Sequence, residues 1–154
     1  MMITESVNGC PLCEGNAAVD AGSAASREQI VTTDYWRVIA HRSALPGWML
    51  IAARSHARSM SDLSDSAAAE LGVLLNQGTV ALEKEFDAIK SYVMQFSEGM
   101  LGHLHFSLAP RSIDLPNDRR GAAISAYNAR DTPLDEPARD DIADRLRAAW
   151  PGQS

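Results

Sequence analysis

Hydrophobic and polar residues alternate most regularly over residues 102–111, whose sequence is GHLHFSLAPR. Because successive side chains of a strand point to opposite faces of a sheet, this alternation predicts a strand. Three apolar side chains would enter a core: Leu104, Phe106 and Leu108. Three polar side chains would share the other face: His103, His105 and Ser107. Two neighbouring histidines are suited to binding a metal or a phosphate or to exchanging a proton. The alternative is a solvent-exposed strand face without a function.

Other segments also have strand patterns, and they are predicted at residues 30–33, 35–41, 48–53 and 89–96. Leu45-Pro46-Gly47 places proline and glycine as a type II turn requires, so residues 48–53 should pair with residues 36–40. Residues 89–96 lead through Ser97-Glu98-Gly99 into the histidine strand. We therefore predict an antiparallel hairpin at that point.

The strongest helix pattern covers residues 67–86, with Ser64 as its N-cap and Gly78 marking close packing against the sheet. A second amphipathic helix is predicted over residues 137–150. Residues 16–26 are rich in Ala, Gly and Ser and are expected to form a surface loop, whereas residues 121–128 fit a strand or a helix. The pattern predicts one α+β domain over residues 1–154, with an antiparallel sheet of about five strands, a long helix packed on it and a C-terminal helix.

Charge and composition exclude some classes of function. The 154-residue chain has a formal net charge of −6, which argues against a protein that grips a polynucleotide through its phosphates, because that needs a basic surface. A single nucleotide needs only a few local donors. Residues 1–9 look like a loose arm without the pattern of a leader sequence, and no apolar segment reaches the roughly 20 residues of a membrane span. We therefore expect a cytoplasmic protein.

The two cysteines of the chain form the motif Cys10-Pro11-Leu12-Cys13. Such a pair is a redox dithiol, half of a metal site, or incidental. A thioredoxin-like dithiol normally follows a buried strand and opens a helix; nothing strand-like precedes Cys10, and Gly15-Asn16 follows closely, so a metal knuckle fits better. A tetrahedral zinc site needs two more ligands, for which the sequence offers four histidines: His41, His56, His103 and His105.

Taken together, these motifs resemble the histidine triad (HIT) superfamily over roughly residues 10–111. The resemblance consists of the Cys-x-x-Cys, the apolar strand after a Pro-Gly turn with His56 just beyond it, the long helix, and a His-Leu-His-Phe strand that ends in Ala-Pro-Arg. HIT proteins are small α+β domains, often dimeric, that hydrolyse or transfer nucleotides at the α-phosphate. The resemblance thus implies a small-molecule nucleotide as substrate and a homodimer.

Within that superfamily, the branch of galactose-1-phosphate uridylyltransferase has a zinc site. Carried over to this chain, the resemblance implies a structural zinc ion held by four ligands: Cys10, Cys13, His56 and His103. His41 replaces His56 if the strand register differs. The family nucleophile is the middle histidine of the motif, which implies His105, and imidazole is nucleophilic near neutral pH and leaves readily once phosphorylated.

The chain departs from the family pattern at Ser107, where most triad proteins have their third histidine. A serine hydroxyl donates a hydrogen bond to phosphate but is no general acid near pH 7. The link Gly99–Gly102 is also shorter than in many HIT hydrolases, so Ser97 is the nearest polar substitute for a phosphate contact. The sequence thus favours a nucleotide hydrolase or nucleotidyltransferase with a nucleotidyl-histidine intermediate. The alternatives are a HIT-fold nucleotide-binding or regulatory protein with little or no activity and, third, a Cys10–Cys13 redox protein.

Overall fold

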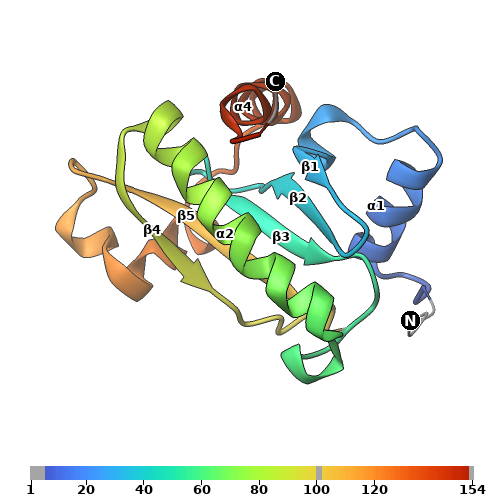
Figure 1. The fold of residues 1–154 in the computed structure, drawn as a ribbon. Helices are drawn as coiled ribbons and strands as arrows, with labels where there is room; N and C mark the ends of the chain where they lie inside the picture. Colours follow the sequence, from blue (N-terminus) through green and yellow to red (C-terminus); the bar gives the residue numbers. More distant parts are fainter. Residues whose placement is uncertain (1–5, 100–101, 153–154) are drawn as a thin grey trace.

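The computed structural model describes residues 6–99 and 102–152, which form an antiparallel sheet with helices on both faces (Figure 1). The strand order is β1-β2-β3-β5-β4. The strands are β1 (Val31–Thr32), β2 (Trp36–Ala40), β3 (Met49–Ala53), β4 (Ala88–Met94) and β5 (His105–Ser112). β3 pairs with β2 and with β5, so the two central strands place Ala52 directly beside His105. The predicted α+β fold with five antiparallel strands is confirmed.

Helix α2 (Asp65–Phe86) and helix α4 (Glu136–Ala149) pack against one face of the sheet (Figure 1). The Ser64 hydroxyl accepts a hydrogen bond from the Ala67 amide at 3.2 Å, which confirms Ser64 as the N-cap. The expected close packing at Gly78 is also present, because a Cβ atom there would lie 2.6 Å from Leu108 Cδ2. Leu104 and Leu108 are fully buried in this core, as the alternation predicts.

The chain after β5 folds back over the opposite face of the sheet. It forms the short helices η3 (Asn117–Arg119), η4 (Gly121–Ser125) and α3 (Ala126–Ala129), so the ambiguous segment 121–128 is helical. Leu115 and Ile124 form a second apolar cluster there with Ala109 of β5 and with Trp48, the residue before β3. Trp48 is therefore a core residue.

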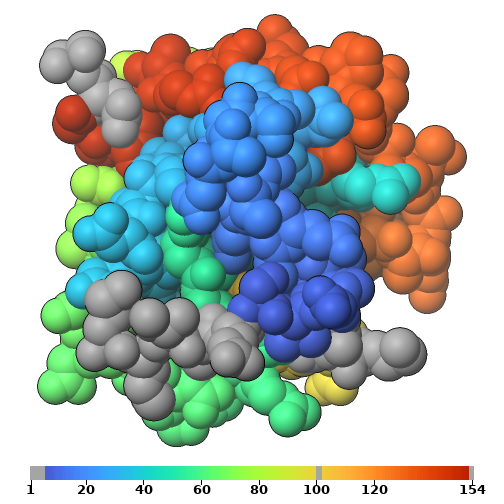
Figure 2. Space-filling view, turned by 90° about the vertical axis from the view of Figure 1, so that its right-hand side faces the viewer, coloured from blue at the N-terminus to red at the C-terminus, as the bar shows by residue number. Residues whose placement is uncertain are grey.

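The N-terminal segment differs from the sequence prediction. Residues 16–20, expected to belong to a loop, lie in helix α1 (Pro11–Asp20), which begins inside the Cys-x-x-Cys motif. Pro11 occupies the first turn, where its missing N–H costs nothing, and Cys13 and Asn16 are the buried residues of the helix. The short helix η1 (Ser26–Glu28) follows, and η2 (Met60–Asp62) precedes α2. The blue surface of the N-terminal segment occupies the centre of the side view in Figure 2.

Strand β5 begins at His105, three residues later than predicted, and His103 lies in the extended segment before it. Residues 1–5 of the expected N-terminal arm and residues 100–101 of the short link lie outside the described residues. Within residues 6–99 and 102–152, we find no helix whose length and apolar content would let it cross a membrane.

Candidate metal centre and neighbouring histidine

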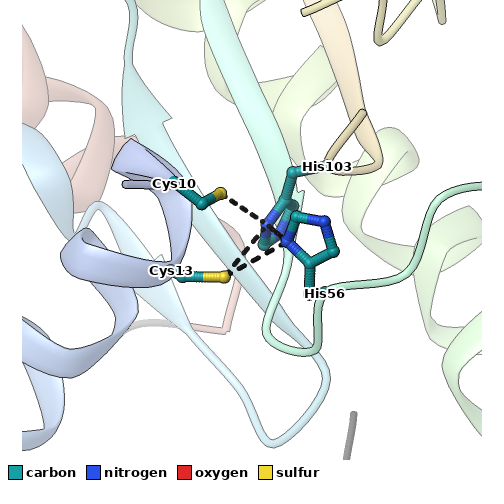
Figure 3. Close-up of side chains that lie close together, drawn as sticks. All are labelled: Cys10, Cys13, His56 and His103. Atoms are coloured by element: carbon teal, nitrogen blue, oxygen red, sulfur yellow. Dashed lines mark hydrogen bonds between the residues drawn. The ribbon is translucent and has the colours of Figure 1, made fainter. Parts of the chain in front are cut away.

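Two cysteines and two histidines from distant parts of the chain converge on one point beside β3 (Figure 3). Cys10 and Cys13 flank the start of α1, His56 follows β3, and His103 precedes β5. Their four ligand atoms, Sγ of each cysteine and Nδ1 of each histidine, lie within 4.8 Å of one another. His41, the alternative ligand, is not in this group.

Four of the six distances among these atoms are close to those of a tetrahedral metal shell. With bonds of about 2.3 Å to sulfur and about 2.0 Å to nitrogen, neighbouring ligand atoms around zinc lie about 3.3 to 3.8 Å apart. His103 Nδ1 lies 3.3 Å from Cys10 Sγ, 3.5 Å from Cys13 Sγ and 3.2 Å from His56 Nδ1. Cys13 Sγ lies 3.3 Å from His56 Nδ1. A donor set of two thiolates and two imidazoles suits zinc and fills its four positions.

The backbone around the two histidines explains how they meet. Leu104 donates its amide proton to the Ala57 carbonyl at 2.8 Å, and Ala53 donates to the Leu104 carbonyl at 3.1 Å. These two bonds join the loop that carries His56 to the segment that carries His103. His103 is thereby buried next to the end of β3, and only 5% of its surface is exposed.

His103 is held in the ring orientation that a metal ligand needs. Its Nε2 atom lies 2.8 Å from the Ala53 carbonyl oxygen, to which it donates, so Nδ1 is left as the unprotonated nitrogen that faces the sulfurs. Burial lowers the pKa of His103, and the neighbouring His56 lowers it further, against the opposing effect of the Ala53 hydrogen bond. The ring is therefore neutral at pH 7, as metal binding requires.

The thiol of Cys13 is more accessible than that of Cys10. Burial raises the pKa of Cys13, which keeps a metal-free thiol protonated; a bound cation reverses this preference, since coordinating thiols are deprotonated. Cys13 and His56 line a surface cavity of about 150 Å³, together with Ser6, Asn16, Ala17, Asp20 and Arg54. The cavity thus borders two of the four ligands.

His105 follows the candidate metal ligand His103 by two positions, and the backbone of His103 fixes its ring. Its Nδ1 atom lies 2.9 Å from the His103 carbonyl oxygen. Donation from Nδ1–H to that carbonyl leaves Nε2 as the nitrogen with a free lone pair. The carbonyl that orients His105 thus belongs to one of the four residues of the metal centre.

Ser97 contacts the backbone of His105 from the neighbouring chain segment. Its hydroxyl accepts the His105 amide proton at 3.2 Å, and Gln95 donates to the same hydroxyl at 2.9 Å. Ser97 has a φ of 52°, a left-handed conformation that non-glycine residues seldom adopt. Ser97 therefore positions the strand that carries His105.

Ser107 lies two residues beyond His105 on the same strand, where it pairs with Leu50 of β3 and Met94 of β4. The side chains of His105 and Ser107 are both half-buried, and residues at i and i+2 of a strand share a face.

A second surface cavity, of about 180 Å³, is lined by Leu45, Pro46, Phe86, Pro110 and Ser112. Neither His105 nor Ser107 lines this cavity or the one beside Cys13.

His41 occupies a separate site at the end of β2. Its ring lies 6.0 Å from the ring of Trp48, measured between centroids. Burial lowers the pKa of His41 to about 4, and the charges of Arg139, His105 and Arg42 act in the same direction. A neutral His41 therefore stands within electrostatic reach of His105.

Two polar residues next to the metal centre are not evident from motif analysis. Arg37 interrupts the apolar strand β2 and is fully buried, and Asn16 is buried in α1. A charged residue inside an otherwise apolar strand is the sequence signal for such a buried guanidinium.

We compared the chain with known proteins. No protein-family model matches it, and no curated protein sequence does. The fold is similar to that of a Zn-bound histidine triad family protein from Mycobacterium smegmatis, with a TM-score of 0.62 and 19% identity over 92% of each chain. The chain has the histidine triad fold.

Two further solved structures share the histidine triad fold with this chain. A hypothetical histidine triad nucleotide-binding protein from Sulfolobus tokodaii matches with a TM-score of 0.66 and 11% identity, over 89% of this chain and 91% of that one. A diadenosine triphosphate hydrolase from Plasmodium falciparum matches with a TM-score of 0.61 and 17% identity, over 79% of this chain and 75% of that one. At these identities the likeness establishes the fold alone.

Proposed function

We propose that the protein is a single-domain nucleotide hydrolase or nucleotidyltransferase that acts at the α-phosphate, with His105 as nucleophile and a structural zinc ion. The observation that carries the proposal is the 2.9 Å contact between His105 Nδ1 and the His103 carbonyl, which reserves Nε2 for attack. The nucleotide-binding and hydrolase names of the two fold relatives support it.

The proposed reaction has two steps at phosphorus. His105 Nε2 attacks the α-phosphorus, a P–N bond forms, and the bond to the leaving-group oxygen breaks with the electron pair on that oxygen. Water or an acceptor hydroxyl then attacks phosphorus, loses its proton to solvent, and returns the electron pair of the P–N bond to Nε2. Ser107 donates a hydrogen bond to a phosphoryl oxygen. Ser97 either donates a similar hydrogen bond or positions His105 by accepting its amide proton.

A bound zinc ion supplies mechanical stabilisation, because four protein ligands leave no open position for a reactive water. Cys10 and Cys13 would tie α1 to His56 and His103. Since the His103 carbonyl holds the ring of His105, this clamp also orients the proposed nucleophile. The Zn-bound fold relative supports zinc as the metal.

The experiment for the nucleophile is to mix the purified protein with a panel of nucleotides, quench, and measure the intact mass. We expect a nucleotidyl adduct that is absent in His105→Ala and retained in His41→Gln, a change at the other histidine that lies outside the metal centre. No adduct and no turnover with any nucleotide would contradict catalysis. Tight nucleotide binding under the same conditions would then favour the alternative, a catalytically weak binding or regulatory protein.

Two observations favour the binding or regulatory protein. The third histidine of the motif is replaced by Ser107, and neither described cavity is lined by His105. The two functions differ in turnover, so hydrolysis rates measured beside binding constants separate them.

Metal analysis of the purified protein tests the zinc site. We expect about one zinc per chain in the wild type and a strong loss in Cys13→Ser. Absence of zinc from the wild type, with a reversible Cys10–Cys13 disulfide in its place, would favour the redox alternative.

A homodimer is the assembly we propose. Exposed apolar side chains lie on α2 and on the neighbouring edge strand β4: Val73, Val80, Ile89 and Val93. An edge strand with apolar side chains favours pairing with a second chain. Light scattering of the wild type and of Val93→Lys tests this, because a monomeric wild type would exclude the dimer. We place the protein in the cytoplasm, as expected from the sequence.

A further inference from the structure

Arg37 carries a positive charge into the interior of the protein, next to the metal centre. The side chain is 0% exposed and donates four hydrogen bonds. Its Nη1 atom contacts the carbonyl and the carboxylate of Glu28, each at 3.0 Å. A buried guanidinium is costly unless its N–H groups find acceptors, so its contacts require a fixed arrangement of the surrounding chain.

The remaining bonds of Arg37 go to α1, the helix that carries the cysteines. Nη2 donates to the carbonyl of Leu12 at 3.1 Å, and Leu12 lies between Cys10 and Cys13. Nε donates to Asn16 Oδ1 at 2.8 Å. The guanidinium lies against the helix so closely that a Cβ atom on Gly15 would approach Nη2 to 2.3 Å.

Asn16 extends this contact to the histidine side of the metal centre. Its Nδ2 atom donates to the carbonyls of Ala53 and Arg54, both at 3.2 Å. The Ala53 carbonyl is also the acceptor of His103 Nε2–H. One continuous hydrogen-bonded path therefore runs from Arg37 through Asn16 to the acceptor that orients His103.

We propose that Arg37 and Asn16 are positioning residues for the metal centre: they hold the Cys10–Cys13 turn and the His103 ring at ligand spacing before the metal binds. The inference rests on the zinc site proposed above. Cys10 is the N-cap of α1 but has no side-chain cap bond, so the start of the helix depends on such external contacts. Outer partners of metal ligands commonly contribute 10- to 100-fold to metal affinity.

The test compares two buried arginines. Arg37→Met removes the bonds to α1 and keeps an unbranched apolar side chain. Arg139→Met is the matched control, because Arg139 is also buried and also contacts Glu28, at 3.3 Å, but otherwise donates to the Ala40 carbonyl and to no residue of α1. Zinc affinity is measured by chelator competition, and the visible spectrum of the cobalt-loaded protein reports the geometry of the ligands.

We expect zinc binding to weaken about 10- to 100-fold in Arg37→Met, with an altered cobalt spectrum, and to change less than about 3-fold in Arg139→Met. Arg37→Lys should recover part of the affinity, since an ammonium reaches some of the same acceptors. Asn16→Ala keeps the Arg37 side chain and its bonds to Glu28 and Leu12 but removes the acceptor of its Nε–H and the bonds to Ala53 and Arg54. It should weaken zinc binding about 10-fold, so it decides the question if Arg37→Met does not fold.

The outcomes separate the two proposals. A wild type that binds no zinc contradicts the zinc site itself. A wild type that binds zinc tightly, with Arg37→Met and Asn16→Ala indistinguishable from Arg139→Met, overturns the positioning role alone.

Discussion

The neutral, half-buried His41 predicts a specific pH dependence of stability. Its ring lies beside Trp48 at the end of β2, and three charged or titratable groups oppose its protonation: Arg139 of α4, His105 of β5 and the adjacent Arg42. Burial, the largest cause, and these groups lower the pKa of His41 from 6.5 to about 4. The folded protein therefore binds this proton less readily than the unfolded chain does.

The direction of the pH dependence follows from the number of protons that the folded and unfolded states bind. Between pH 6.5 and about 4 the unfolded state holds the proton and the folded state does not, so stability falls as pH falls through this window. Above pH 6.5 the contribution is fully present. The pKa difference corresponds to about 3 kcal/mol in total and to about 2 kcal/mol lost between pH 7.5 and pH 5.

Urea unfolding at pH 7.5, 6 and 5 measures this effect in the wild type and in His41→Gln. Glutamine does not titrate, so the free energy of unfolding should fall by about 2 kcal/mol less in the variant than in the wild type over the same range. Loss of metal at low pH is common to both proteins and cancels in the difference. Equal pH dependence in the two proteins would refute the lowered pKa assigned to the half-buried His41.

Two other predictions concern α2 and β5. Gly78→Ala should lower the free energy of unfolding by about 1 to 3 kcal/mol, because the new Cβ would lie 2.6 Å from Leu108 Cδ2. Gly72→Ala in the same helix, with nothing within 4 Å, should raise it by about 0.5 to 1 kcal/mol, and thermal unfolding of both tests the packing. If the proposed activity is present, the wild type should prefer phosphoanhydrides over nucleoside phosphoramidates, and Ser107→His should raise amine release about 10-fold or more by supplying a general acid. Faster amine release by the wild type than phosphoanhydride cleavage would contradict the role given to Ser107.

The sheet and the long helix were predictable because their signals are local. The alternation around Phe106 sets which side chains are buried, and the Ser64 N-cap marks the start of α2. The close approach at Gly78 was also predictable, since a glycine inside a strong helix pattern usually has a packing reason.

Helix α1 was not predictable from local signals. Gly15 and Asn16 are typical of a turn, and the helix buries only two of its ten residues. Its contacts include a hydrogen bond from Arg37, which lies more than twenty positions away in the sequence, to the Leu12 carbonyl. The four-residue cluster was expected from family resemblance, but the choice of His56 over His41 required the strand register.

The contact between Cys10 and His103 has a consequence for the order of folding. These residues are 93 positions apart, so the ligand set is complete only after most of the chain has left the ribosome. Because local contacts form before contacts between distant parts of a chain, we expect the metal centre to assemble after the local helices and hairpins. Until then Cys10 and Cys13 lack the two imidazoles that complete the ligand set.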